Sequence, residues 1–259
     1  MAQSRTVERR YRQYPGMIFD ADVRSWLDAR QSVNDKPAPT WAAAVNRAVL
    51  RLKNTPSLVS GLSNWSAIDS LVIPVQANLL AGALKPLKGS CTNFNFVQGD
   101  LVANGMKGLS ASQKSLGLGT SRVNPNASMG VWAWGPLVTS GLIGRVSNLS
   151  IIVLGTGPSN ITYRSFSNVA ITVPAFQGLI GWSRLNTNEV HHTVSRSAVE
   201  TTALAATAAP AAGTLSGFQV GGSFAWTNAT LGLMWHGQAV NIATVQTIFN
   251  ELMLPYFGG

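Results

Sequence analysis

The spacing of apolar side chains predicts three amphipathic helices, two near the start of the chain and one near its end. The first runs from Asp20 to Arg30 with Asp20 as its N-cap, and the second runs from Thr40 to Lys53 with Thr40 as its N-cap. The third is capped by Asn241 and stops near Pro255. Their apolar stripes are Val23, Trp26 and Leu27; Trp41, Val45, Ala48, Val49 and Leu52; and Val245, Ile248, Phe249 and Leu252.

Between the second and third helices, short runs rich in Val, Ile, Trp and Thr alternate with Gly, Pro, Asn and Ser, a pattern that predicts β-strands. Turn signals recur about every 8–12 residues, which is typical of a sandwich or barrel. The expected strands are Leu71–Val75, Met129–Trp134, Leu142–Val146, Leu149–Leu154, Asn168–Val173, Gly178–Arg184, Val190–Ser195, Leu215–Val220 and Ala229–Trp235.

The change of composition near residue 55 divides the chain in two. We expect residues 1–56 to form an arm with docking helices, and residues 57–259 to form a β-sandwich domain with a C-terminal helix. The predicted fold class is therefore mainly β, an antiparallel β-sandwich preceded by N-terminal helices and an extended arm.

Charge is concentrated at the start of the chain. The formal net charge is +9, yet residues 1–53 hold ten basic and five acidic side chains, and the remaining residues hold nine and five. The β region has no basic stripe interleaved with aromatic residues, which argues against a nucleic-acid-binding role. The first sixteen residues predict an assembly arm, since Arg and Tyr are enriched at interfaces; its candidate contact residues are Arg5, Arg9, Arg10, Tyr11, Arg12 and Tyr14.

The sequence offers little material for catalysis. A glycosidase needs two acids, one on either side of the scissile bond; spacing leaves open a pair such as Glu189 with Glu200 in the β region, but no motif supports it. His191 and His192 are adjacent, so a regular strand would point them to opposite faces and prevent a shared metal. Cys91, the single cysteine, is expected to be a buried or half-buried inert thiol. We therefore expect no enzyme activity, cofactor or metal.

Two other features have a structural and a functional interpretation. The segments Gly117–Gly119 and Gly155–Gly157 lack the lysine and the spacing of nucleotide-binding loops, so both predict turns. Trp132, Trp134 and Trp182 are weak candidates for stacking against a glycan, although tryptophans at such positions more often belong to the core.

Membrane insertion and secretion are not expected. The sequence has no run of about 18 apolar residues, and no apolar segment follows the basic start. We expect the chain to be made and folded in the cytoplasm.

Several segments resemble a widespread family of uncharacterised structural proteins of tailed bacteriophages and prophages. They are Phe19–Arg24, the helix Trp41–Lys53, Asn64–Gln76, Leu79–Gly89, Asn95–Gly119 and Leu231–Met253. The resemblance covers most of the chain from residue 17 onward and implies a laminin-G/concanavalin-like jelly roll. Its motifs are of the fold type, so no functional residue is carried over.

The resemblance implies a virion structural protein, tail-associated as a fibre or adhesin component, that contacts other virion proteins and forms a homo-oligomer such as a trimer. The alternatives are a capsid decoration or head-fibre protein, and a glycan-binding protein that recognises a host surface polysaccharide. The chain lacks an acidic cluster, which argues against a calcium-dependent sugar site.

Overall fold

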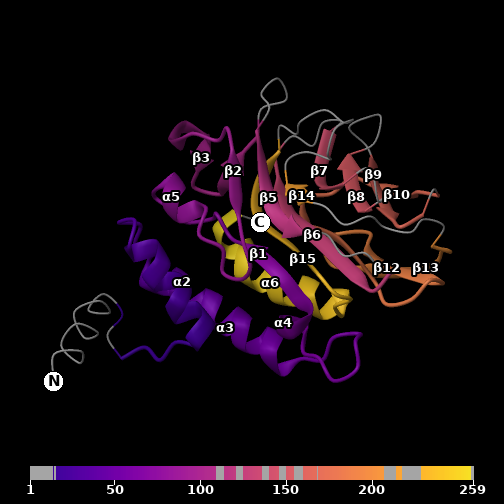
Figure 1. Ribbon diagram of the computed structural model, residues 1–259, viewed down its shortest axis with the longest axis horizontal. Coiled ribbons are helices and arrows are strands. Elements are labelled where there is room, and N and C mark those ends of the chain that lie inside the picture. Colours follow the sequence, from indigo (N-terminus) through magenta and orange to yellow (C-terminus); the bar gives the residue numbers. More distant parts are fainter. Residues whose placement is uncertain are drawn as a thin grey trace.

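A computed structural model places two antiparallel sheets face to face, with helices over the outer face of one of them (Figure 1). The structure describes residues 14, 16–108, 114–120, 125–135, 140–145, 150–154, 160–167, 169–206, 214–217 and 229–257. The predicted fold class, a mainly β antiparallel sandwich with N-terminal helices, is confirmed.

The first sheet lies between the second sheet and the helices. Its described strands follow the order β13-β12-β11-β6-β15-β4-β3, and β1 also pairs with β15. Their bounds are β1 Ile68–Val72, β3 Leu101–Val102, β4 Gly105–Lys107, β6 Ala127–Trp134, β11 Gly178–Arg184, β12 Glu189–Thr193, β13 Val199–Ala203 and β15 Thr230–Gly237. The central pair joins β6 to β15, which are far apart in the sequence.

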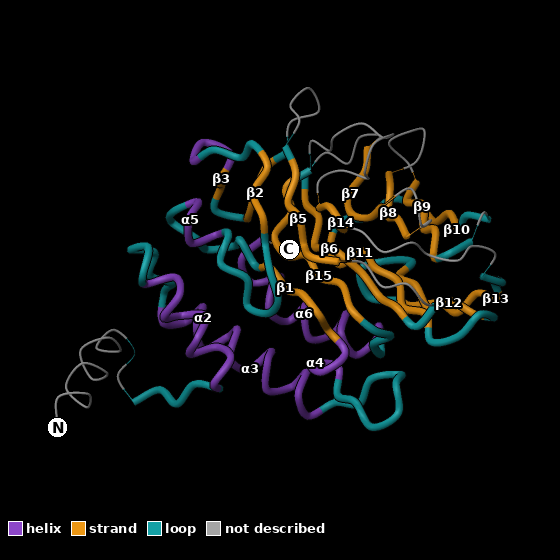
Figure 2. The backbone as a smooth tube through the Cα atoms, in the orientation of Figure 1, coloured by secondary structure: helices purple, strands orange, loops and turns teal. Residues whose placement is uncertain are grey.

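The second sheet forms the other layer of the sandwich (Figure 2). Its described strands follow the order β10-β9-β8-β7-β14-β5-β2. Their bounds are β2 Thr92–Phe94, β5 Ser115–Thr120, β7 Ser140–Arg145, β8 Ser150–Leu154, β9 Asn160–Ser165, β10 Ile171–Pro174 and β14 Thr214–Gly217.

Helices from both ends of the chain lie together on the first sheet (Figure 1). The helices are α2 Ala21–Gln31, α3 Pro39–Asn54, α4 Asn64–Ala67, α5 Leu80–Ala83 and α6 Ile242–Phe257, and the short η1 is Gln98–Asp100. Helix α6 contacts α3, β11 and β12. The apolar stripes predicted for the three long helices are all buried.

Two hydrophobic cores result from this layering, and the strands of the first sheet contribute to both. Along β6, Trp132 joins the core under the helices, while Met129 and Val131 join the core between the sheets. This division follows from the strand's two-residue period, which sends alternate side chains to opposite faces. Strand β6 is therefore mostly apolar and is buried at every residue except the half-buried Trp134, as expected for a strand that is covered on both sides.

Trp235 of β15 illustrates how closely the helix-side core is packed. Its ring lies over Gly130 of β6 and Gly181 of β11, the two neighbouring positions on adjacent strands. A Cβ added at Gly130 would collide with this ring, and one at Gly181 would lie 2.8 Å from its Cη2 atom. The ring of Phe249 from α6 lies 5.6 Å from that of Trp235.

The N-terminal helices share a core with the sandwich. Trp26 of α2 and Trp41 of α3 belong to the same buried cluster as Trp132 and Trp235 of the sheet. The division of the chain at residue 56 thus follows composition, while the packing of the described residues crosses it.

Two details of the helix predictions differ from the structure, and one agrees with it. Helix α3 has Ala38 rather than Thr40 as its N-cap, because Pro39 takes the first helical position and brings the start forward. Helix α6 continues through Pro255 to Phe257. Asp20 caps α2 as predicted, and its side chain accepts from the N–H of Asp22.

The strand predictions missed six strands, β2, β3, β4, β5, β9 and β13, and placed β1 three residues too late. Gly117–Gly119 lies within β5, so the prediction of a turn there was wrong. The segment Gly155–Gly157 and the predicted extended arm at residues 1–13 lie outside the described residues. No helix in the described part of the chain is both long enough and apolar enough to cross a membrane.

Candidate functional site

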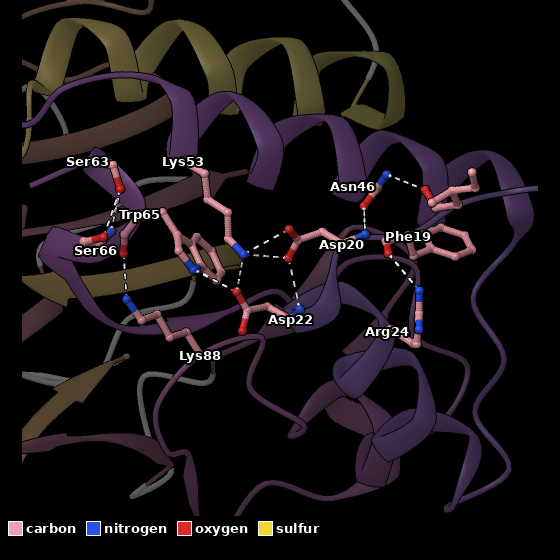
Figure 3. Close-up of polar contacts among 11 residues, drawn as sticks. Phe19, Asp20, Asp22, Arg24, Asn46, Lys53, Ser63, Trp65, Ser66 and Lys88 are labelled. Atoms are coloured by element: carbon pink, nitrogen blue, oxygen red, sulfur yellow. Dashed lines mark hydrogen bonds and ion pairs between the residues drawn. The ribbon is translucent and has the colours of Figure 1, made fainter.

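A network of charged side chains joins α2, α3, α4 and the segment after β1 (Figure 3). We call it the Trp65 junction; it comprises Asp20, Asp22, Lys53, Trp65 and Lys88. The Nζ of Lys53 lies 2.8 and 2.9 Å from the two carboxylate oxygens of Asp20, and 2.6 Å from Oδ2 of Asp22. One ammonium group at the end of α3 thus holds both the N-cap aspartate and the first-turn aspartate of α2.

These contacts shift the pKa values of the groups that make them. Burial alone would raise the pKa of Asp20, but hydrogen bonds from Lys53 and from the N–H of Asp22 outweigh it, so the pKa is lowered. Burial likewise opposes the charge of Lys53, but its hydrogen bonds to Asp20 and Asp22 raise its pKa. Asp20 and Lys53 are therefore ionised at neutral pH.

Trp65 is the apolar centre of the junction and is 6% exposed. Its Nε1 donates to Oδ2 of Asp22 at 3.0 Å, and the Nζ atoms of Lys53 and Lys88 lie 5.8 and 5.1 Å from its ring centroid. Lys88 also donates to the carbonyl oxygen of Trp65 at 2.6 Å. Desolvation lowers the pKa of Lys88 despite the opposing effect of Asp69 and Asp22. Two cations thus interact with one indole ring.

Asparagines extend the junction in both directions. Oδ1 of Asn46 accepts from the N–H of Asp20 at 2.8 Å, which joins α3 to the start of α2 (Figure 3). Asn64 is fully buried; its Nδ2 donates to Thr55 Oγ1 at 3.0 Å, and its Oδ1 accepts from the N–H of Asn241 at 2.8 Å. The starts of α4 and α6 are therefore fixed to the end of α3.

A separate buried ion pair fixes the other end of α2. Arg30 and Asp35 have fully buried side chains, and Arg30 Nε donates to Asp35 Oδ2 at 2.5 Å. Asp35 Oδ1 accepts from the N–H of Asn78 at 2.8 Å, and Arg30 Nη2 donates to the carbonyl of Gln76 at 3.2 Å. Gly82 of α5 leaves the space that Asp35 occupies.

These two networks hold the helices in place and do not present a reactive group. Every carboxylate of the Trp65 junction is held by a lysine or by hydrogen-bond donors, so none is free to act as a base. Among the described residues no group of three or more His, Cys, Asp and Glu could hold a metal ion.

Two of the three candidate stacking tryptophans are enclosed by the fold. Trp132 and Trp182 are fully buried, one under the helices and one between the sheets, so in this structure neither offers a ring face to a glycan. The reason is that the first sheet is covered on both sides. Trp134 is half-buried, and the guanidinium carbon of Arg196 lies 5.6 Å from its ring centroid.

Of the six candidate contact residues of the arm, only Tyr14 lies within the described residues. Arg5, Arg9, Arg10, Tyr11 and Arg12 lie outside the described residues. Tyr14 is 2% exposed, its hydroxyl donates to the carbonyl of Pro37 at 2.9 Å, and its ring meets that of Phe19 edge-on. Tyr14 therefore anchors its segment to the helices and is not available as an interface residue.

The candidate chemical groups of the β region are separated by the strand geometry. Glu200 pairs with His192, and Glu189 is three residues from His192 on β12, so the two acids project from opposite faces of the hairpin. They cannot flank one glycosidic bond. His191 and His192 also face opposite ways: His191 contacts Thr201 at 2.8 Å, and His192 stacks edge-on with Tyr163.

Cys91 is half-buried, and desolvation raises its pKa to about 12. The thiol is therefore protonated at neutral pH and is a poor nucleophile, as predicted.

Comparisons with known proteins add little to this geometry. No family model matches the chain, and no curated protein matches it. Among solved structures, it is similar to a Trypanosoma rangeli sialidase in complex with sialic acid, at 10% identity, over 83% of this chain and 38% of that one, with a TM-score of 0.49.

It is also similar to the binding domain of Botulinum neurotoxin DC in complex with rat synaptotagmin II, at 10% identity, over 56% of this chain and 42% of that one, with a TM-score of 0.40. The binding domain of botulinum neurotoxin serotype D matches at 9% identity, over 70% and 51% of the two chains, with a TM-score of 0.45. The chain spans about two fifths to one half of the length of these structures. Such similarities carry no functional argument.

Proposed function

We propose that the chain is a non-enzymatic structural protein of a tailed bacteriophage particle, tail-associated as a fibre or adhesin component. The observation that supports the proposal is that the segments that carry the resemblance meet in one structural network. Asp20, Asp22, Lys53, Trp65 and Lys88 all come from the resembling segments, and together they form the Trp65 junction (Figure 3).

This arrangement suits a particle component. The junction and the shared core fix α2, α3 and α6 to the sandwich. The helices and the sandwich can therefore act as one rigid unit. A rigid module positioned by an N-terminal segment is what assembly at a fixed place on a particle requires. The proposed partners are other virion proteins and further copies of this chain.

Mass spectrometry of gradient-purified particles tests the proposal directly. We expect the chain at a fixed copy number relative to the major capsid protein, retained after washing with high salt. Antibody labelling of intact particles then distinguishes a tail position from a capsid decoration or head fibre. Absence of the chain from purified particles would refute the proposal.

The arm is tested by a deletion that respects the position of Tyr14. Because Tyr14 is anchored to Pro37, removing residues 1–13 spares its contact. We expect this variant to remain folded but to be missing from particles. A matched variant with glutamine in place of Arg5, Arg9, Arg10 and Arg12 keeps the length and tests whether charge is the requirement. Normal incorporation of both variants would refute the docking role of the arm.

A further inference from the structure

A groove lies where the C-terminal half of α6 meets the turn between β12 and β13. Its volume is about 660 Å³, and it is lined by Arg196, Ser197, Gln246, Thr247, Asn250, Glu251, Leu254 and Pro255. This volume is within the range of about 300–1,000 Å³ that small-molecule sites occupy. The lining combines a guanidinium, two amides and two hydroxyls with the apolar side chains of Leu254 and Pro255.

Arg196 is the cation of this groove that remains available. Among the described residues it has no ion-pair partner, whereas the neighbouring Glu251 is already paired with Arg51 of α3. The guanidinium of Arg196 is held in position by Trp134 at 5.6 Å and by a hydrogen bond of 3.3 Å from its Nε to the carbonyl of Gln177. A pre-positioned guanidinium loses little freedom when it binds a carboxylate through two parallel hydrogen bonds.

The two amides of the groove are also fixed. Gln246 donates its Nε2 to the carbonyl of Ser195 at 2.9 Å, and Asn250 donates its Nδ2 to the carbonyl of Arg196 at 2.7 Å. These bonds set the orientation of both amides, and Gln246 is only 3% exposed, so the two amides form the floor of the groove. Oδ1 of Asn250 is buried and has no hydrogen-bond partner in the described part of the structure. Because this atom is enclosed, the exposed hydroxyls of Ser197 and Thr247 are the polar groups of the groove that are open to a sugar.

We infer that this groove binds an acidic oligosaccharide, with Arg196 holding a sugar carboxylate and the exposed hydroxyls of Ser197 and Thr247 exchanging hydrogen bonds with sugar hydroxyls. Leu254 and Pro255 supply the apolar surface against which the C–H face of a ring can pack. In this inference the buried Trp132 and Trp182 do not contact the glycan. Trp134 acts indirectly, because its ring supports the guanidinium of Arg196. This inference does not depend on the proposed role in a virion, because it concerns ligand binding by the isolated chain.

The test uses the purified full-length chain in calorimetric titrations with oligogalacturonate, alginate oligomers and oligomers of α2,8-linked sialic acid. Maltooligosaccharides of matched length serve as neutral probes. We expect saturable binding to at least one acidic series, with binding to the neutral series at least about tenfold weaker. Absence of saturable binding to all three acidic series would overturn the inference.

Variants locate the binding. Arg196→Gln should lower the affinity at least about tenfold, since it removes a charge-assisted contact. Arg47→Gln is the matched control, because it makes the same charge change on α3 outside the groove, and it should leave affinity unchanged. Thr247→Trp fills the groove from an exposed helical position and should abolish binding. Equal affinity in Arg196→Gln and the parent chain, or equal losses in Arg196→Gln and Arg47→Gln, would refute the site.

The outcome is independent of the particle experiments. A chain that binds acidic sugars but is missing from purified particles would refute the proposed function alone, whereas a chain found in particles that binds none of the sugars would refute the groove alone.

Discussion

Lys53 has contacts that local sequence does not reveal. By sequence it is a basic residue near the C-terminal end of a helix, a position that the helix dipole favours. In the structure it pairs with two aspartates of another helix and lies beside an indole ring. Its role follows from tertiary packing, which brings α2 and α4 to the end of α3.

Replacing Lys53 with alanine should destabilise the fold by about 1–2 kcal/mol, because it leaves Asp20 and Asp22 close together without their shared cation. Urea denaturation would measure the change. Lys107→Ala, at an exposed position, is the control and should stay within about 0.5 kcal/mol of the parent chain. If the two variants were equally stable, the junction would not be a stabilising feature.

His192 predicts a dependence of stability on pH. Desolvation lowers its pKa, with partial compensation from backbone hydrogen bonds and from Glu200. Because the unfolded chain then binds a proton more readily, stability is complete above the ordinary histidine pKa of about 6.5 and falls as the pH drops below it. His192→Leu should flatten the stability profile between about pH 6.5 and 5. Urea midpoints across this range test the prediction, which an unchanged slope would contradict.

At the scale of elements, the long helices and the most apolar strands could be predicted from sequence, and the sheet order could not. Strand β11 was predicted with its observed bounds, because its run of apolar residues is flanked by clear turn signals. Strand β5 was missed because alternate glycines resemble a turn until β2 and β14 are seen beside it. Periodicity indicates which side chains share a face, but not which distant strand pairs with which.

The helix caps give a sharp element-level prediction. Oδ1 of Asn241 accepts from the N–H of Thr244 at 3.1 Å, so Asn241→Ala should destabilise the fold by about 1 kcal/mol. Thr40→Ala should cost little, because α3 begins before Thr40 and has no side-chain cap. Thermal unfolding of the two variants compares them directly. A larger loss for Thr40→Ala would mean that α3 starts where the sequence pattern placed it.

At the scale of the whole molecule, the sequence favoured burial of the tryptophans, which Trp132 and Trp182 confirm, but not the elements that bury them. The alternation along β6 correctly placed Trp132 and Trp134 on one face. Whether that face met solvent depended on α2, α3 and α6, which come from the two ends of the chain. The groove was equally invisible, because Arg196 and Asn250 are brought together only when α6 lies against the turn after β12.

The shared core predicts the effect of truncation. Removing residues 1–56 would expose the apolar side chains of α4 and α6 in the helix-side core, since α3 packs against both helices. We expect residues 57–259 to aggregate when expressed alone, and size-exclusion chromatography with circular dichroism would show this. A monomeric, cooperatively folding fragment would instead make the first 56 residues a separable docking unit.

The place of Trp235 across two glycines has a consequence beyond the core. The indole has no room to retreat into the sheet, so any side chain introduced at Gly130 or Gly181 must drive it toward Phe249 and hence against α6. That helix forms one wall of the groove beside Arg196. We therefore expect Gly130→Ala to displace α6 and to change affinity at the inferred groove, although Gly130 lies in the sheet and is not among the residues that line the groove.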